Sequence, residues 1–309
     1  MPNKEAIGER AWFCKPHYQI IICKTQQTPS NHYFRAMSSA QIKNAFISIG
    51  EIDSTIPPTS LLLKVGISMQ YIRYFVQSIT HDQIIFFGEY TLHHVETADE
   101  LCQRLERIVE KDDVLQLSFS KTLVGLDGPY SLLPSGFASK STDNGHINQT
   151  ISRLDLNMSF EADNALVNKI ALLFRNHTVV HINSALLPCF ADAVEKGQQK
   201  IFANIEQYHF DVLAFNEQGG LQIMNRYEFK TQTDFIYFLL LCCKQLNFDP
   251  EKTELVLSGE VDIQSKVYDV CYRYFRFISF VRKPENIHFA KALETYPKHL
   301  HFNLYNLGA

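Results

Sequence analysis

The chain has 309 residues, 46% of them hydrophobic, so it can bury a substantial core and is long enough for two domains of ordinary size. Its 29 lysine and arginine residues nearly balance 33 aspartate and glutamate residues, which gives a formal net charge of -4. No basic field favours a polyphosphate partner, and this argues against nucleic-acid binding.

The cysteines and the apolar runs predict a cytoplasmic protein. There are seven cysteines, an odd number without a Cys-x-x-Cys pair, which fits neither a disulfide framework nor a zinc site. The longest apolar run, over residues 235–243, is too short to span a bilayer, and residues 1–10 are followed by no stretch suited to a signal peptide. We therefore expect free thiols, no metal and no membrane insertion.

Residues 1–60 are expected to form an N-terminal extension outside the regular pattern of the chain. Residues 18–23 could be a strand, Pro57 and Pro58 break the chain before the first regular element, and Met37 could be the true start. The regular pattern begins at residue 61.

Residues 61–196 predict a first α/β lobe. Three runs rich in β-branched and aromatic residues, separated by very short polar breaks, indicate a three-stranded meander. The helix that follows has Thr97 as its expected N-cap, with Glu100 three residues later in the position of a capping box. We predict strands at residues 61–68, 71–79, 83–92, 114–119 and 178–182, helices at 97–110, 162–174 and 184–195, and an insertion around 120–160 that includes a polar excursion at 140–148.

Residues 197–309 predict a second lobe with the same order of elements, followed by a C-terminal segment. Gly219 and Gly220 mark the turn of a hairpin. We predict strands at residues 200–206, 209–216, 221–229, 254–257 and 277–281 and helices at 231–246, 262–275 and 286–295. The order β-β-β-α-β-α-β-α used twice predicts two tandem lobes, each with a mixed sheet.

This repeated order resembles the ribonuclease-H-like domains of the actin, sugar-kinase and heat-shock ATPase superfamily. Three motifs, Leu-Leu-Pro-Ser-Gly-Phe at 132–137, Glu-Leu-Val-Leu-Ser-Gly-Glu at 254–260 and His-Leu-His-Phe-Asn-Leu-Tyr at 299–305, are similar to a Bacteroidetes family of unknown function with the actin-like ATPase fold. The resemblance implies two tandem domains of that fold, and it implies no particular activity.

In actin-like ATPases, Asp-x-Gly turns in the first hairpin of each domain place Mg·ATP in the cleft between the domains. Here the first strand contains Lys64, Gly66 and Ser68, so a lysine stands where the family has its carboxylate. The second hairpin, residues 203–208, has neither the aspartate nor the glycine, and Glu206 is its only acid. These degenerate positions predict that no Mg·ATP cofactor is held, and that Lys64, as one exposed lysine, attracts phosphate only weakly.

A third turn, at Ser258, Gly259 and Glu260, resembles the adenosine-side loop of the superfamily with its second glycine replaced. Because glycine is the usual residue in a tight turn, we interpret it as a structural strand-to-helix turn. Asp127 begins an Asp-Gly-Pro sequence that is typical of ordinary turns. A nuclease of this fold would need acids on its first and fourth strands, and the expected fourth strand, 114–119, has none.

The histidines and the paired cysteines are interpreted as structural residues. His177 and His181 are four residues apart, a spacing that binds metal on a helix, but they fall on a predicted strand. Cys242 and Cys243 lie in a predicted apolar helix and are expected to be buried, inert thiols.

The sequence therefore predicts a non-catalytic actin-like protein that acts as a scaffold or interaction module for an unknown protein partner or for its own copy. The alternative is an ATPase or small-molecule kinase with a divergent site, which would use ATP and Mg²⁺ and take its acids from Glu206, Asp211 or Glu260. The sequence identifies neither the partner nor the pathway.

Overall fold

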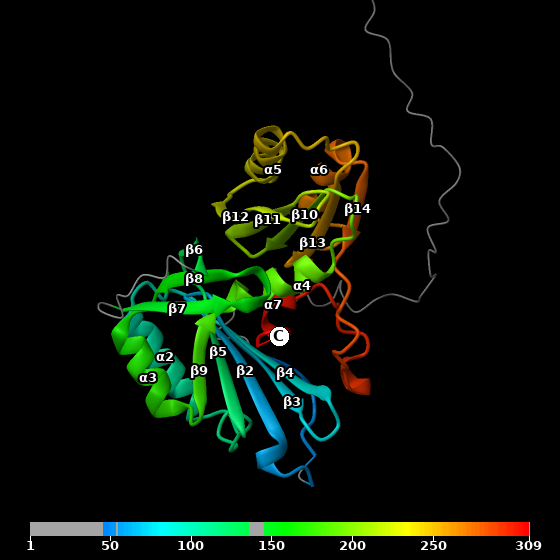
Figure 1. Ribbon diagram of the computed structural model, residues 1–309. Coiled ribbons are helices and arrows are strands. Elements are labelled where there is room, and N and C mark those ends of the chain that lie inside the picture. Colours follow the sequence, from blue (N-terminus) through cyan, green and yellow to red (C-terminus); the bar gives the residue numbers. More distant parts are fainter. Residues whose placement is uncertain (1–45, 54, 136–144, 309) are drawn as a thin grey trace, which may run out of the picture. The chain divides into compact units, whose positions relative to one another are not determined.

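Figure 1 shows the computed structural model, which describes residues 46–53, 55–135 and 145–308. The strand expected at 18–23 and the alternative start at Met37 lie outside these residues. The described residues form two mixed sheets of six and five strands and a separate three-stranded antiparallel sheet.

The first sheet has the order β1-β4-β3-β2-β5-β9, and its first three consecutive strands, β2 to β4, form the predicted antiparallel meander. Strands β5 and β9 then pair in parallel on the other side of β2. Strand β1, from the expected N-terminal extension, pairs with the edge of β4. The strands are β1 Phe46–Gly50, β2 Leu61–Ile67, β3 Tyr71–Ser78, β4 Gln83–Thr91, β5 Lys121–Leu126 and β9 His177–His181.

The prediction of a strand at residues 114–119 is wrong. This segment is a series of turns, because the Asp112 carboxylate accepts hydrogen bonds from the backbone amides of Val114 and Leu115, at 2.9 and 3.0 Å. The fourth strand of the lobe is instead β5, and the insertion therefore begins after Leu126 rather than near residue 120.

The remaining elements of the first lobe are its helices and an inserted sheet. Helix α2, Ala98–Val109, begins with the predicted capping box of Thr97 and Glu100, and helix α3, Asn164–Leu173, packs beside it. The helix expected at 184–195 is a short 3₁₀ turn, Ile182–Ala185, followed by α4, Leu186–Asp192. The inserted sheet consists of β6 Tyr130–Pro134, β7 His146–Ile151 and β8 Leu156–Glu161.

The second sheet has the order β12-β11-β10-β13-β14, which matches β4-β3-β2-β5-β9 of the first sheet strand for strand. In both, three antiparallel strands are followed by two parallel ones. This match confirms the predicted use of one unit twice. The strands are β10 Lys200–Ile205, β11 His209–Phe215, β12 Leu221–Glu228, β13 Glu254–Gly259 and β14 Phe277–Phe280.

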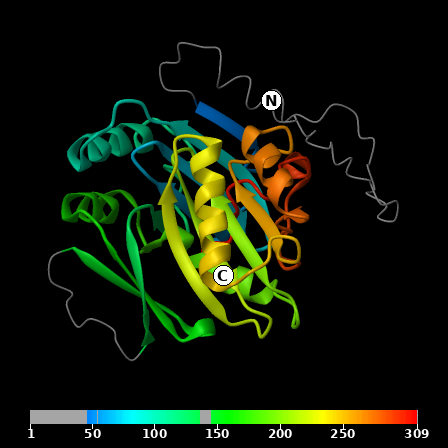
Figure 2. The ribbon, with the colours of Figure 1, turned by 90° about the horizontal axis from the view of Figure 1, so that it is seen from above.

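Two helices, α5 Gln232–Leu246 and α6 Lys266–Tyr274, lie together over one face of the second sheet (Figure 2). Helix α6 begins later than predicted because Ser265 is its N-cap and accepts a hydrogen bond from Tyr268 N. The helix expected at 286–295 is only a 3₁₀ turn, Lys291–Leu293.

The C-terminal segment, which we define as residues 299–307, contains the short helix α7, Phe302–Tyr305. Residues 300–307 are all buried, and α7 contacts β2 and β3 of the first sheet and β13 of the second. Figure 1 shows α7 between the two sheets.

In the described part of the chain, no helix combines the length and the apolar character needed to cross a membrane. The five cysteines within the described residues are free thiols, as predicted, and Cys242 and Cys243 are buried. Cys14 and Cys23 lie outside the described residues.

Candidate functional site

The candidate site is the set of polar contacts between the two sheets, where an actin-like ATPase would hold its nucleotide. Lys64 of β2 is only 4% exposed, and its Nζ donates a hydrogen bond to the carbonyl oxygen of Tyr305, at 2.6 Å. Burial lowers the pKa of Lys64 to about 8. The expectation of an exposed lysine is therefore wrong, because the side chain is covered by the C-terminal segment.

The other two predicted positions of the first hairpin have structural contacts. A Cβ on Gly66 would lie 2.8 Å from Ile182 Cδ1, so glycine allows this close packing. The Ser68 hydroxyl accepts hydrogen bonds from the backbone amides of Gln70 and Tyr71, at 3.1 and 3.2 Å. These two amides are thus bound within the hairpin itself.

Arg73, on β3, is the centre of the first buried ion cluster. Its Nε lies 3.2 Å from Glu89 Oε2 of the neighbouring strand, and its Nη1 lies 3.0 Å from Glu206 Oε2 of the second lobe. Its Nη2 also pairs with Glu260 Oε1 of the second lobe. The guanidinium stacks over the Tyr71 ring, 3.6 Å from the ring centroid. We call Arg73, Glu89, Glu206 and Glu260 the Arg73 cluster.

The Arg73 cluster contains three carboxylates and a single guanidinium. Burial and the nearby Glu260 and Asp127 raise the pKa of Glu206, although Arg73 opposes them. Burial also raises the pKa of Glu89 against the effect of Arg73. Both carboxyls are consequently biased toward the protonated, neutral form.

His301, from the C-terminal segment, does not supply the missing positive charge. Its Nε2 lies 3.7 Å from Glu89 Oε2. Burial, together with the nearby Arg73 and His299, holds the pKa of His301 well below its usual value, so the ring is neutral.

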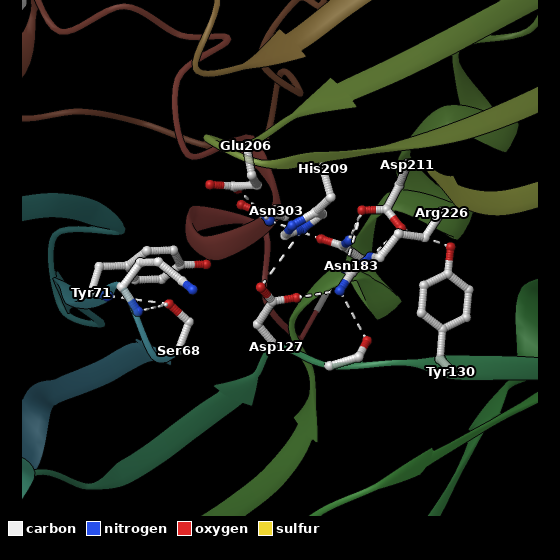
Figure 3. A network of polar contacts seen from close by, with 12 residues as sticks. Ser68, Tyr71, Asp127, Tyr130, Asn183, Glu206, His209, Asp211, Arg226 and Asn303 are labelled. Atoms are coloured by element: carbon white, nitrogen blue, oxygen red, sulfur yellow. Dashed lines mark hydrogen bonds and ion pairs between the residues drawn. The ribbon is translucent and has the colours of Figure 1, made fainter. Parts of the chain in front are cut away.

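Arg226, on β12, is the centre of a second cluster (Figure 3). Its Nε and Nη2 bind both carboxylate oxygens of Asp211 on β11, each at 3.1 Å. Its Nη1 lies 2.8 Å from Asp127 Oδ1 of the first lobe and donates to the carbonyl oxygen of Gly128, at 3.0 Å. We call Arg226, Asp127 and Asp211 the Arg226 cluster.

Neutral donors complete the Arg226 cluster. Tyr130 OH and Asn183 Nδ2 each donate to Asp211, at 2.9 and 2.6 Å. Burial alone would raise the pKa of Asp127, but Arg226, with His209 and His181, outweighs it and holds the pKa below its usual value.

Asn303 joins the C-terminal segment to both clusters. Its Nδ2 donates to Asn183 Oδ1 at 2.8 Å and lies 3.5 Å from Glu206 Oε1 (Figure 3). The C-terminal segment and the two clusters therefore form one continuous polar network between the sheets.

The turn after β13 has the structural role predicted from its glycine. Gly259 has a φ of 83°, and a Cβ there would lie 2.1 Å from the carbonyl oxygen of Ile205. Its amide donates to His299 O at 2.7 Å, the next amide, of Glu260, donates to Ile205 O at 2.6 Å, and the Ser258 hydroxyl donates to Asn204 Oδ1 at 3.0 Å. The backbone donors of Gly259 and Glu260 are thus bound by the protein's own carbonyls.

Of the seven predicted positions, the structure brings Glu206 and Glu260 together on Arg73 and leaves the others in separate structural contacts. The sequence reasoning missed Arg73, Arg226 and the buried charge of Asp127. The sequence did contain a signal for these ion pairs, because residues on neighbouring strands of a predicted hairpin are expected to face each other. The observed registers pair Arg73 with Glu89 and Asp211 with Arg226. His177 and His181 lie at the two ends of strand β9, which agrees with the prediction that they fall on a strand and not on a helix.

Comparison with known proteins identifies the fold. Residues 54–278 match the family described as "Protein of unknown function (DUF3822)". A crystal structure from Bacteroides thetaiotaomicron, described as a protein with actin-like ATPase fold and unknown function, is 17% identical, with 75% of this chain and 94% of that chain covered and a TM-score of 0.65. A chain of the PilM-PilN type IV pilus biogenesis complex is 8% identical, with 81% and 98% covered and a TM-score of 0.50.

Both structural similarities concern the fold alone. No curated protein matches the sequence. The predicted resemblance to an uncharacterised family with the actin-like ATPase fold is confirmed by the family match and by the first of these structures. Because the match covers most of its length, the chain belongs to the DUF3822 family of proteins of unknown function.

Proposed function

We propose that this protein is a non-catalytic member of the actin-like fold and acts as a scaffold or protein-interaction module. The observation that carries the proposal is the C-terminal segment, whose residues 300–307 are buried in contact with strands of both sheets. The hydrogen bond from Lys64 to Tyr305 O fixes this segment against strand β2.

The backbone donors that would bind phosphate support the proposal. A phosphate site needs oriented N–H groups that face the ligand. The amides of Gln70 and Tyr71 bind the Ser68 hydroxyl, and those of Gly259 and Glu260 bind protein carbonyls. A nucleotide would have to break these bonds before it could use the donors.

The acids of the alternative, an ATPase or kinase, are also engaged. Glu206 and Glu260 pair with Arg73, and Asp211 accepts a bidentate pair from Arg226. Mg²⁺ requires near-ideal octahedral oxygen ligands, so each of these carboxylates would have to leave its arginine partner in order to coordinate it.

A melting curve of the full chain with and without millimolar Mg·ATP tests the proposal. Ligand at about 100 times its Kd adds roughly 2.7 kcal/mol of stability, which corresponds to a shift of several degrees. We expect no shift and no release of phosphate from ATP. A reproducible shift of that size that is lost on adding EDTA would overturn the proposal and favour the enzyme.

A further inference from the structure

Strand β14 forms an edge of the second sheet. Strand β14 is last in the strand order, and no other strand of the described residues pairs with its outer side. Val281 N donates to Leu257 O of β13. Successive residues of a strand direct their N–H and C=O groups to opposite sides, so those of Ile278 and Phe280 point away from β13. An unpaired edge of this kind is a template for an added strand.

Aromatic side chains lie on both faces of this edge. Phe277 is 42% exposed on one face. On the other face, Tyr272 is 71% exposed and stacks on Tyr268, which in turn stacks on Phe280, with ring centroids 6.4 and 5.7 Å apart. A strand added at the edge would place alternate side chains against Phe277 on one face and against Phe280 and Tyr272 on the other.

The same surface is basic in a chain whose net charge is -4. Arg276 precedes β14, Arg282 follows it, and both are exposed, as is Arg273 in the last turn of α6. The Arg276 guanidinium lies 5.4 Å from the centroid of the Phe277 ring. Acidic groups are therefore the complementary charges for a ligand along this edge.

We propose that the edge of β14, with the outer face of α6, is a docking surface for an extended, acidic segment of a partner protein. This inference rests on the proposed function and names the surface and the partner chemistry. The segment would add a strand to β14, with its apolar residues on the exposed rings and its carboxylates on Arg276 and Arg282.

An anionic membrane is the other surface that exposed aromatic and basic side chains suit. A bilayer offers no ordered ladder of partners for the strand-edge amides and carbonyls that Ile278 and Phe280 direct outward, because its hydrocarbon core has none and its headgroups are irregular. The open backbone edge thus favours a protein segment.

The test is selection of a random heptapeptide display library on the full chain, with counter-selection on the double variant Arg276→Glu, Arg282→Glu. We expect enriched peptides in which acidic residues alternate with β-branched or aromatic ones. The selected peptide, made with a fluorescent label, should bind the double variant at least tenfold more weakly. The matched control is charge reversal at two exposed lysines outside the proposed surface, Lys111→Glu with Lys230→Glu, which should change the Kd less than twofold.

N-methylation of the peptide tests the backbone pairing without altering the protein. Methyl groups on one alternate set of amides should weaken binding at least tenfold, and methyl groups on the other set should leave the affinity within twofold. The proposal is overturned by enrichment of no acidic peptide, by equal effects of the two N-methylated sets, or by binding of phosphatidylglycerol vesicles that depends on the two arginines while no peptide binds. A Mg·ATP-induced melting shift would contradict the proposed function and leave this binding result unchanged, so the two failures are distinguishable.

Discussion

The two arginine clusters occupy equivalent positions in the two lobes. In each lobe an arginine and an acid face each other on neighbouring strands, and the two residue types have exchanged strands between the lobes. Arg73 is the third residue of β3 and pairs in register with Glu89, whereas Asp211 is the third residue of β11 and pairs in register with Arg226. One unit used twice thus places an ion pair at the same point of each sheet, in opposite orientation.

The turn after the fourth strand is equivalent in the same way. The amide of Asp127 donates to the last residue of β2, and the amide of Glu260 donates to the last residue of β10. Each of these acids reaches the arginine of the other lobe, so the two lobes exchange matching contacts.

The clusters differ at one position, where Ser68 of the first hairpin corresponds to Glu206 of the second. Their amides make equivalent hairpin bonds, to Tyr71 O and His209 O, at 3.0 and 2.9 Å. Glu206 adds a third carboxylate to the Arg73 cluster, and its pKa is raised, whereas the pKa of Asp127 in the Arg226 cluster is lowered. Burial raises the pKa of Glu206 and the neighbouring acids add to it, whereas at Asp127 the effect of Arg226, with His209 and His181, outweighs burial.

The largest expected effect is that of Arg73→Met. It leaves the buried Glu89 and Glu206 and the partly buried Glu260 without a cation, so we expect a loss of about 3–5 kcal/mol in the free energy of unfolding. Urea denaturation measures it. Replacing the three glutamates with glutamine in the same variant should restore most of the loss, and a loss below about 1 kcal/mol would contradict the role of the cluster.

Arg226→Met should have a smaller effect, of about 3 kcal/mol, at the low end of the range for a broken buried pair. Tyr130 and Asn183 still donate to Asp211 in this variant, and His209 Nε2 lies 3.7 Å from Asp127 Oδ2. The comparison of the two urea midpoints is the measurement. An Arg226 variant that is less stable than the Arg73 variant would mean that the third carboxylate does not matter.

The contribution of Glu206 to stability should fall as the pH rises from about 6.5 to 8. The pKa of Glu206 is raised from 4.5 to about 8 by burial, so in this window the folded chain holds a proton that the unfolded chain has lost. The expected contribution is a decrease of at most about 1.4 kcal/mol per pH unit. His181, His299 and His301 have lowered pKa values in the folded chain, as do Lys64 and Lys298, so these groups contribute slopes of the opposite sign. The contribution of Glu206 is therefore measured as a difference between variants.

Glu206→Gln removes this proton, so over the same pH range the slope of its unfolding free energy against pH should be more positive than that of the natural protein. The matched control is Glu228→Gln at the exposed end of β12, which should keep the slope of the natural protein. Parallel slopes for Glu206→Gln and the natural protein would contradict a raised pKa at Glu206.

Local patterns were enough to predict most elements of the fold. The capping box of Thr97 and Glu100 and the glycine of the turn at 259 depend on a few neighbouring residues, and both are present as predicted. The prediction of a strand at residues 114–119 failed because an alternating apolar pattern fits both a strand and a series of turns. The turns form here because the Asp112 carboxylate accepts hydrogen bonds from the amides of Val114 and Leu115.

The site could be predicted only in part, because its contacts join residues far apart in the chain. The loss of the two Asp-x-Gly turns was visible in the sequence, but the burial of Lys64 was not, since Tyr305 covers it from 241 residues away. The motif at 299–305 was recognised, yet nothing local indicated that it lies between the sheets.

Amide hydrogen exchange of the C-terminal segment tests the central claim most directly. If this segment occupies the space between the sheets, the amides of Leu304, Tyr305 and Asn306, which donate to the carbonyl oxygens of His301 and Phe302, should exchange as slowly as those of β2. Millimolar Mg·ATP should leave their exchange unchanged. Exchange within seconds, or a change of rate on adding Mg·ATP while β2 and β10 stay protected, would contradict the account.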